Sequence, residues 1–456
     1  MKEFVQKHFM LTLFCAVLVF CALVFATHYA MQQPKIYNLL GGVVKTYDVK
    51  YTKQGKEINK TSQPYQTIQS DKLRVWDAYH YWVIKQYLYT GGPEDMFLLS
   101  FAFFPLFPIL WRLTGLNEIG ISLMNWLLFA LGLMLIYKIF KDKVPKWSFL
   151  LIFCVPFLVP FMIPYTEGLF FILIAIGLYG IIKDNYALYF VGFLLASMTK
   201  SSANIFIVAF FFVELIKALR VGTIRTLIVG FCKRILPILL GVLLVLCFQK
   251  YRGAPSFIQF SLSQQYYGRV IAFPHLPFTD WSYEGKSITW PMTYMFFIPM
   301  IVVLVREFFL SFKVKRSENF TTYAYVRLLS ILFLVGNILF VMLTSDNKLN
   351  SLARYMLCTP FFFYLLFDTI TYERKKIYNI LYLLIGVATI ILCLNLFSPF
   401  DSFGIYILMP ATAIVFFYRY LNRKLLYTLI GILIFMNIFW TAYMFNAFIC
   451  DGWIFT

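Results

Sequence analysis

Long apolar runs alternate with short polar or basic segments along most of this 456-residue chain. A run of about 20 apolar residues can cross the hydrocarbon layer of a bilayer as a helix. The pattern predicts about thirteen such helices, several of them shorter than usual. The predicted spans cover residues 9–30, 118–137, 147–163, 168–182, 187–199, 204–219, 235–249, 290–305, 328–344, 355–371, 377–396, 403–418 and 425–446.

A long polar segment, residues 31–117, separates the first two spans, and we expect it to contain short surface helices. Near its end, the apolar stretch from Phe101 to Leu113 contains Pro105 and Pro108. Proline disturbs a helix interior. The stretch is therefore a further span, or a re-entrant or interfacial helix.

The composition indicates an all-α, polytopic integral membrane protein. Apolar residues make up 61% of the chain and charged residues only 13%, which no soluble domain requires. We expect one integral membrane domain, residues 1–456, without a separate soluble catalytic module. The first apolar run is long for a signal peptide and has no clear cleavage site, so we interpret it as a retained span.

The net charge of +19 does not indicate nucleic-acid binding, because the basic residues fall in short runs between apolar segments. With the N-terminus in the cytoplasm, nearly all of these runs lie on the cytoplasmic side, as the positive-inside rule requires. They are residues 138–146, 183, 217–234, 306–327, 374–376 and 419–424. The intervening polar loops then face the extracytoplasmic side.

Neither a metal centre nor a nucleotide site is predicted. The eight cysteines are scattered, and none forms a CxxC pair. No His/Cys/carboxylate set has metal-ligand spacing, and no glycine-rich phosphate loop is present. We therefore expect no bound metal, no cofactor and no direct use of a nucleotide sugar.

The predicted extracytoplasmic loops carry the candidate chemistry. Asp77 lies in the sequence Trp76-Asp77-Ala78-Tyr79-His80-Tyr81. On a short helix, Asp77, His80 and Tyr81 would lie within one turn, and the carboxylate could accept a proton from a hydroxyl. The alternative is a surface helix whose dipole favours an acid at its start.

Four further motifs follow in predicted extracytoplasmic segments or at the outer ends of spans. Each also has a purely structural interpretation. Glu167 could cap a helix, Lys200 could extend to the lipid headgroups, and Arg354 could be an interfacial anchor. The motifs are Ala102-Phe103-Phe104-Pro105-Leu106-Phe107-Pro108, Pro164-Tyr165-Thr166-Glu167-Gly168, Thr199-Lys200-Ser201-Ser202-Ala203-Asn204 and Ala353-Arg354-Tyr355.

In this order, the five motifs resemble those of the PIG-V family of mannosyltransferases, which belongs to the GT-C superfamily of membrane glycosyltransferases. The resemblance covers about residues 76–355. Residues 356–456 are similar only in being apolar helix. Two departures are evident: Asp77 has no adjacent second acid, and Lys200-Ser201-Ser202-Ala203 replaces the usual Arg-Ser-Asn-Gly. Lysine keeps the charge but lacks the planar fork of arginine.

The resemblance implies a GT-C-like fold and an inverting transfer of a sugar, mannose by analogy, from a polyprenyl-phosphate donor to a lipid or glycan acceptor. Asp77 would be the general base, and Lys200 and Arg354 would neutralise the lipid phosphate. The implied substrate-binding residues are His80, Tyr81, Tyr165, Glu167, Lys200, Ser201, Arg354 and Tyr355.

The composition favours a bacterial cytoplasmic membrane, with the site on its extracytoplasmic side. The acceptor stays open, as does any contribution of Glu94, Asp95, Arg269 or His275. The rival function is a transporter or a lipid or polysaccharide flippase, which would place ionisable groups at mid-membrane. A scaffold subunit would need no cluster of polar groups on one side.

Overall fold

The computed structural model describes residues 8–36, 48–52, 55–59, 65–90, 94–266, 296, 299–309, 320–344, 351–371, 379–381, 383–388, 399–451 and 454. This part of the chain is predominantly helical, as predicted. The long polar segment also contains an antiparallel hairpin of β1 (Asp48–Thr52) and β2 (Gly55–Asn59), with Asp48 opposite Asn59.

Six helices in the described part are long and apolar enough to cross a bilayer. Shorter apolar helices pack among them, which identifies an integral membrane protein. The long helices are α2 (Phe9–Ala30), α7 (Glu118–Phe140), α10 (Ile205–Val221, preceded by the short helix η4, Ser201–Asn204), α11 (Ile224–Tyr251), α14 (Thr322–Thr344) and α19 (Arg423–Ile449). The shorter ones include α8 (Glu167–Ile182), α9 (Tyr186–Thr199), α16 (Pro360–Thr371) and α18 (Pro399–Phe417).

Most helix positions agree with the hydrophobic pattern. Prolines account for two differences, one in residues 355–371 and one in residues 147–163. The predicted span 355–371 is two helices, α15 (Leu352–Leu357) and α16, which starts at Pro360. Proline disfavours a helical conformation in the residue before it, so a helix tends to end there. Spans 290–305 and 377–396 lie partly outside the described residues.

The prediction of a helical span over residues 147–163 was wrong. This segment forms two 3-10 helices, η2 (Lys146–Cys154) and η3 (Val159–Phe161), which are separated by a break that contains Pro156; Pro160 lies within η3. It is almost completely buried within the bundle. Non-helical backbone is tolerated at membrane depth only where protein surrounds it and satisfies its polar groups.

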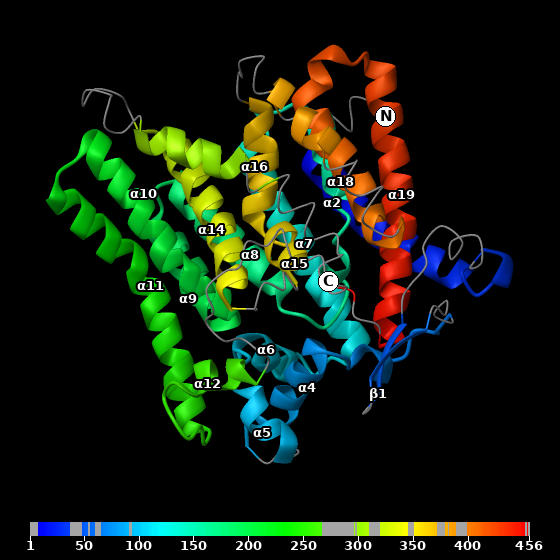
Figure 1. Cartoon of the computed structure of the whole chain (residues 1–456). Coiled ribbons are helices and arrows are strands. Elements are labelled where there is room, and N and C mark those ends of the chain that lie inside the picture. Colours follow the sequence, from blue (N-terminus) through cyan, green and yellow to red (C-terminus); the bar gives the residue numbers. More distant parts are fainter. Residues whose placement is uncertain are drawn as a thin grey trace.

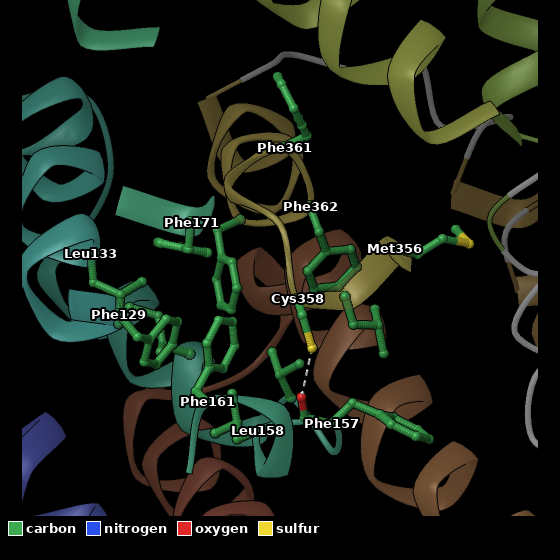
Figure 2. Close-up of a cluster of buried hydrophobic side chains, with 14 of the residues drawn as sticks. Phe129, Leu133, Phe157, Leu158, Phe161, Phe171, Met356, Cys358, Phe361 and Phe362 are labelled. Atoms are coloured by element: carbon green, nitrogen blue, oxygen red, sulfur yellow. Dashed lines mark hydrogen bonds between the residues drawn. The ribbon is translucent and has the colours of Figure 1, made fainter. Parts of the chain in front are cut away.

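Side chains from distant helices supply those hydrogen bonds. On α19, Asn437 Nδ2 donates to the carbonyls of Phe153 and Val155, both at 2.8 Å. The neighbouring Trp440 Nε1 donates to the carbonyl of Pro156 at 3.0 Å. Figure 2 shows a third case, the Cys358 thiol directed at the carbonyl of Phe157.

Aromatic side chains fill the space around this segment. Phe161 stacks on Phe129 of α7, with ring centroids 3.9 Å apart, and meets Phe171 of α8 edge to face. These rings point toward one another in Figure 2. On the far side of α8, Gly192 of α9 lies so close that an added Cβ would be 2.6 Å from the backbone nitrogen of Gly177. Small residues allow such close helix crossings in membranes.

Short helices gather at one end of the bundle, below the long helices in Figure 1. They are α4 (Asp77–Tyr87), α5 (Glu94–Ser100), α6 (Leu106–Thr114) and α12 (Gln259–Gln265). We call this the α4 end. The ambiguous stretch Phe101–Leu113 is resolved here: α6 starts after Pro105 and has 9 residues, too few to cross a bilayer.

The opposite end of the bundle carries the turns that are rich in lysine and arginine, and we call it the basic end. Contacts link these turns directly: Lys146 Nζ lies 5.2 Å from the ring of Phe9, and Trp147 packs on Tyr418. The turn from α10 to α11 is at this end in Figure 1, where Arg220 pairs with Glu307 at 2.6 Å.

Candidate functional site

Asp77 is the first residue of α4, where the positive end of the helix dipole favours an acid. The preceding residue, Trp76, has φ +52°, a conformation that is costly for a bulky side chain and tends to persist at functional sites. Arg74 ties this turn to the bundle, because its Nε donates to Glu118 of α7 at 2.7 Å.

Glu167 is the first residue of α8, and Asn125 of α7 holds the turn before it. Asn125 Nδ2 donates to the carbonyls of Pro160 and Ile163, and its Oδ1 accepts from the N–H of Gly168 at 2.8 Å. A Cβ on Gly168 would be 2.1 Å from the Asn125 carbonyl oxygen. Only glycine therefore fits at this position.

Lys200 and Arg354 come from two other helix ends. Lys200 terminates α9 in an extended conformation, which turns the chain into η4. Arg354 lies on the short helix α15, which follows Ser351 at φ +62°. The break before Pro360 keeps α15 at the α4 end instead of continuing it into α16.

These four charged side chains meet in one ion-pair cluster. Arg354 bridges both acids: its Nη1 is 2.7 Å from Asp77 Oδ2, and its Nε is 2.6 Å from Glu167 Oε1. Lys200 Nζ donates to the same Glu167 oxygen at 2.7 Å. With Asp77, Glu167, Lys200 and Arg354 ionised, the cluster is electrically neutral.

The four members differ in accessibility. The side chains of Glu167 and Arg354 are only 1% and 3% exposed, Lys200 is 12% exposed, and Asp77 is 24% exposed. Glu167 Oε2 is buried and has no hydrogen-bond partner among the described residues. Asp77 is therefore the most accessible member of the cluster, and Glu167 Oε2 is a buried acceptor oxygen that a hydrogen-bond donor could satisfy.

Aromatic rings enclose the cluster. Arg354 lies over Tyr165, with Cζ 4.7 Å from the ring centroid, and Lys200 Nζ lies 4.7 Å from the centroid of Tyr355. Such contacts stabilise a partly desolvated cation. Tyr81 meets Tyr165 edge to face at 6.4 Å.

The aromatic-proline motif completes this wall. Phe103 stacks on His80 with centroids 4.5 Å apart, and it also contacts Tyr81. Phe107, on α6, packs against the same tyrosine. All five motifs therefore meet at the α4 end, although they are spread over almost 300 residues of sequence.

The surroundings shift the pKa of one cluster member, Arg354, and of the neighbouring His80. Burial lowers the pKa of His80 to about 4, although the nearby Asp77 carboxylate opposes the shift. The imidazole is thus neutral at pH 7. Burial also acts to lower the pKa of Arg354, but the carboxylates of Glu167 and Asp77 outweigh it and raise that pKa further above its ordinary value.

Two of the structural alternatives differ from the contacts observed: Lys200 pairs with Glu167 instead of extending to lipid headgroups, and Arg354 is buried instead of being an interfacial anchor. Glu167 lies in the first turn of α8, as its structural interpretation predicted, and it also binds two cations.

Other predicted members are not joined to the cluster. Ser201 starts η4 and has no hydrogen bond to it among the described contacts. Arg269 and His275 lie outside the described residues, as do the side chains of Glu94 and Asp95.

Asn125 is a site-building residue that the sequence analysis missed. It lies within an apolar span, and a fully buried amide in such a helix must find hydrogen-bond partners. A buried amide in an apolar span could therefore have indicated a structural role for Asn125. The sequence did not reveal which backbone groups the Asn125 side chain would bind.

Within the described part of the chain, no three His, Cys, Asp or Glu side chains gather closely enough to hold a metal ion. Comparison with known proteins found no matching family model, no matching curated protein and no matching solved structure.

Proposed function

We propose that this protein is a membrane glycosyltransferase that transfers a sugar from a polyprenyl-phosphate donor to a lipid or glycan acceptor. The supporting observation is the bridge that Arg354 makes between the partly exposed Asp77 and the buried Glu167. It brings an accessible carboxylate and two fixed cations together. A sugar transfer in which a phosphate is the leaving group needs both: a base for the acceptor hydroxyl and cations for the phosphate.

In the proposed reaction, the acceptor hydroxyl oxygen attacks the anomeric carbon as its proton passes to the Asp77 carboxylate. The bond between the anomeric carbon and the phosphate oxygen breaks, and the lipid phosphate leaves with the electron pair. Lys200 and Arg354 stabilise the developing negative charge. Attack opposite the leaving group inverts the anomeric configuration.

The neutral cluster gives the donor a direct influence on Asp77. In the absence of a ligand, Arg354 is held by the carboxylates of Asp77 and Glu167. An arriving phosphate would compete with these carboxylates for Arg354, which would release the Asp77 carboxylate toward the acceptor hydroxyl. Glu167 keeps both cations in place, and its Oε2 can accept a hydrogen bond from a sugar hydroxyl.

The orientation is part of this proposal. The basic end would face the cytoplasm, in accordance with the positive-inside rule, and the α4 end would be extracytoplasmic. The rival function, a transporter or flippase, gains less support. The buried acids Glu214 and Asp368 lie toward the basic end, where Arg234 and Arg327 accompany them.

The test is sugar transfer by the purified full-length protein from a synthetic polyprenyl-phosphate mannose to a panel of glycolipid and glycan acceptors. Transfer with inversion, unaffected by EDTA, is the expected result. Activity that EDTA removes and magnesium or manganese restores would contradict the metal-free mechanism. Lack of transfer from any polyprenyl-phosphate sugar, together with transport of such a lipid by reconstituted protein, would favour the rival function.

A further inference from the structure

A second group of charged side chains lies at the basic end, at one end of an apolar groove. The groove is a cavity of 280 Å³ lined by α14, α16, α18, the helical residues 299–309, Leu381 and Ile385, and it reaches Met356 of α15. Its wall is formed mainly by aliphatic and aromatic side chains, among them Met300, Val303, Ile331, Leu334, Leu365 and Val415. The volume is near the lower limit of about 300 Å³ for ligand pockets, which suits a single narrow chain.

The lining on α14 and the lining on α16 each cover about a third of the hydrocarbon thickness of a bilayer. On α14, its lining runs from Arg327 to Leu334, and on α16 it runs from Phe362 to Thr369. At the rise of an α-helix, each distance is roughly 10 Å, compared with a bilayer hydrocarbon thickness of about 30 Å. The charged lining residues are all at the basic end.

The groove also has an exposed edge. Two of its apolar lining residues, Val302 and Leu381, are each 42% exposed on the outside of the bundle. In an integral membrane protein, an exposed apolar edge of this kind is suited to contact with lipid. A hydrocarbon chain can therefore enter from the side, without crossing the protein.

Among the described charged side chains at the basic end of the groove, Arg306 makes only a long ion-pair contact. Arg327 pairs with Asp368 at 2.5 Å, and Arg220 pairs with Glu307 at 2.6 Å. Arg306 is the third arginine, with a side chain that is 46% exposed and 3.9 Å from Glu307, which Arg220 already binds closely. Among the described side chains of this group, Arg306 is thus the arginine whose nearest carboxylate is already bound by another arginine, which favours an anion beside it.

We propose that this groove binds an anionic phospholipid from the leaflet at the basic end. One acyl chain occupies the groove, and the headgroup phosphate lies against Arg306. A polyprenyl-phosphate donor is a poorer fit, because the proposed reaction places its phosphate at Arg354, whereas the exposed arginine of this groove is Arg306 at the basic end. The preference for a phospholipid over the donor therefore rests on the proposed function, whereas the binding of an anion at Arg306 does not.

The experiment measures lipid retention by native mass spectrometry. Delipidated full-length protein is incubated with phosphatidylglycerol or with phosphatidylcholine of the same acyl chains. Wild-type protein should retain phosphatidylglycerol preferentially. Arg306→Ala should reduce that retention roughly fivefold, because one basic contact to an anionic lipid contributes about 1 kcal/mol, and should leave phosphatidylcholine retention unchanged. Arg306→Lys should restore the preference.

Two further variants complete the design. Arg225→Ala removes the same charge at the same end of the bundle but outside the groove, so phosphatidylglycerol retention should be unchanged. Val302→Trp narrows the exposed edge and should reduce retention of both lipids. Equal retention by the Arg306→Ala and Arg225→Ala variants would overturn the proposal. Displacement of phosphatidylglycerol from wild-type protein by polyprenyl phosphate would also overturn it, because the groove would then belong to the donor.

Discussion

At the residue scale, the cluster assigns different tasks to its two acids, and Asp77→Asn tests that assignment. The amide keeps the size of the side chain but cannot take up the proton. Turnover should fall roughly 10²- to 10⁴-fold, the usual contribution of a positioned base. Donor binding should not weaken, because Arg354 no longer has a carboxylate competing with the phosphate. The measurements are single-turnover transfer and donor affinity.

Asp71→Asn is the matched control for that variant. Asp71 is another exposed acid of the same polar segment, on the 3-10 helix Asp71–Leu73, and it does not contact the cluster among the described ion pairs. Its removal should leave turnover unchanged. An Asp77→Asn protein that transfers sugar at nearly the wild-type rate would eliminate the role as general base and leave Asp77 as a structural partner of Arg354.

Arg354→Lys should give a different pattern. Lysine keeps the charge but cannot bridge Asp77 and Glu167 with two N–H groups in a fixed plane. Both donor affinity and turnover should therefore decrease, with Arg112→Lys as the control. The Arg112 side chain is exposed at the same end and binds only backbone carbonyls in the described structure. Turnover lost with unchanged donor affinity would show that Arg354 does not bind the phosphate.

His80 links acidity to stability. Its folded-state pKa of about 4 is below the ordinary value of 6.5, so between these pH values the unfolded chain binds more protons than the folded protein. The free energy of unfolding should therefore decrease as the pH falls from 6.5 toward 4. His80→Gln should reduce this loss. The thermal midpoints of both proteins at pH 7 and pH 5 provide the measurement, and an equal decrease in both would assign the effect to other groups.

At this scale, the sequence allowed us to predict which residues belong to the candidate site, but it did not allow us to predict which of them form ion pairs with one another. Asp77, Glu167, Lys200 and Arg354 stood out because a charge is costly in an apolar chain. That Arg354 would bridge two acids depends on where α15 ends and α8 begins. Those positions follow from tertiary packing, which no local pattern encodes.

At the scale of elements, Asn125→Leu tests how α7 positions the start of α8. The substitution leaves the carbonyls of Pro160 and Ile163 and the N–H of Gly168 without their partner. Each buried orphan costs about 1–3 kcal/mol. We expect a lower thermal midpoint and, because Glu167 follows this turn, a loss of turnover in the fraction that remains folded.

Asn117→Ala separates the two effects. Asn117 caps the exposed start of the same helix by accepting from the N–H of Gly120, and its loss costs about 1 kcal/mol. Stability should decrease with turnover per folded molecule unchanged. If Asn125→Leu behaves in the same way, the turn does not position Glu167 for function.

Most of the helices were predictable from the hydrophobic runs. Residues 146–161 show why the prediction of one membrane-spanning helix was wrong. Hydropathy measures the preference of side chains for lipid or a protein core. It does not reveal whether the backbone is hydrogen-bonded within the segment or to distant side chains. Pro156 and Pro160 were the local warning, but their effect depends on Asn125 and Asn437, which supply the missing hydrogen bonds.

At the scale of the whole molecule, the separation of the α4 end from the basic end can be tested by topology. Cysteines introduced at the exposed positions Asp71 and Arg112 should react with a membrane-impermeant reagent added outside intact cells. Cysteines at Lys143 and Arg225 should react only after the membrane is opened. Thr199 and Ser351 are buried and are unsuitable labelling sites. Labelling of Asp71 and Lys143 from the same side would exclude the proposed orientation.

The segment with 3-10 helices also has a consequence for how the chain is made. Asn437, which satisfies the carbonyl of Phe153, is synthesised 284 residues later. Until α19 enters the membrane, the carbonyls of Phe153, Val155 and Pro156 lack these hydrogen-bond partners. Each such carbonyl that is exposed to lipid without a partner costs several kcal/mol of free energy. A nascent chain that stops before α19 contains all five motifs but cannot complete its core. It should therefore be recognised and degraded by membrane quality-control proteases. Stable folding of the chain would thus require that α19 has been synthesised and inserted.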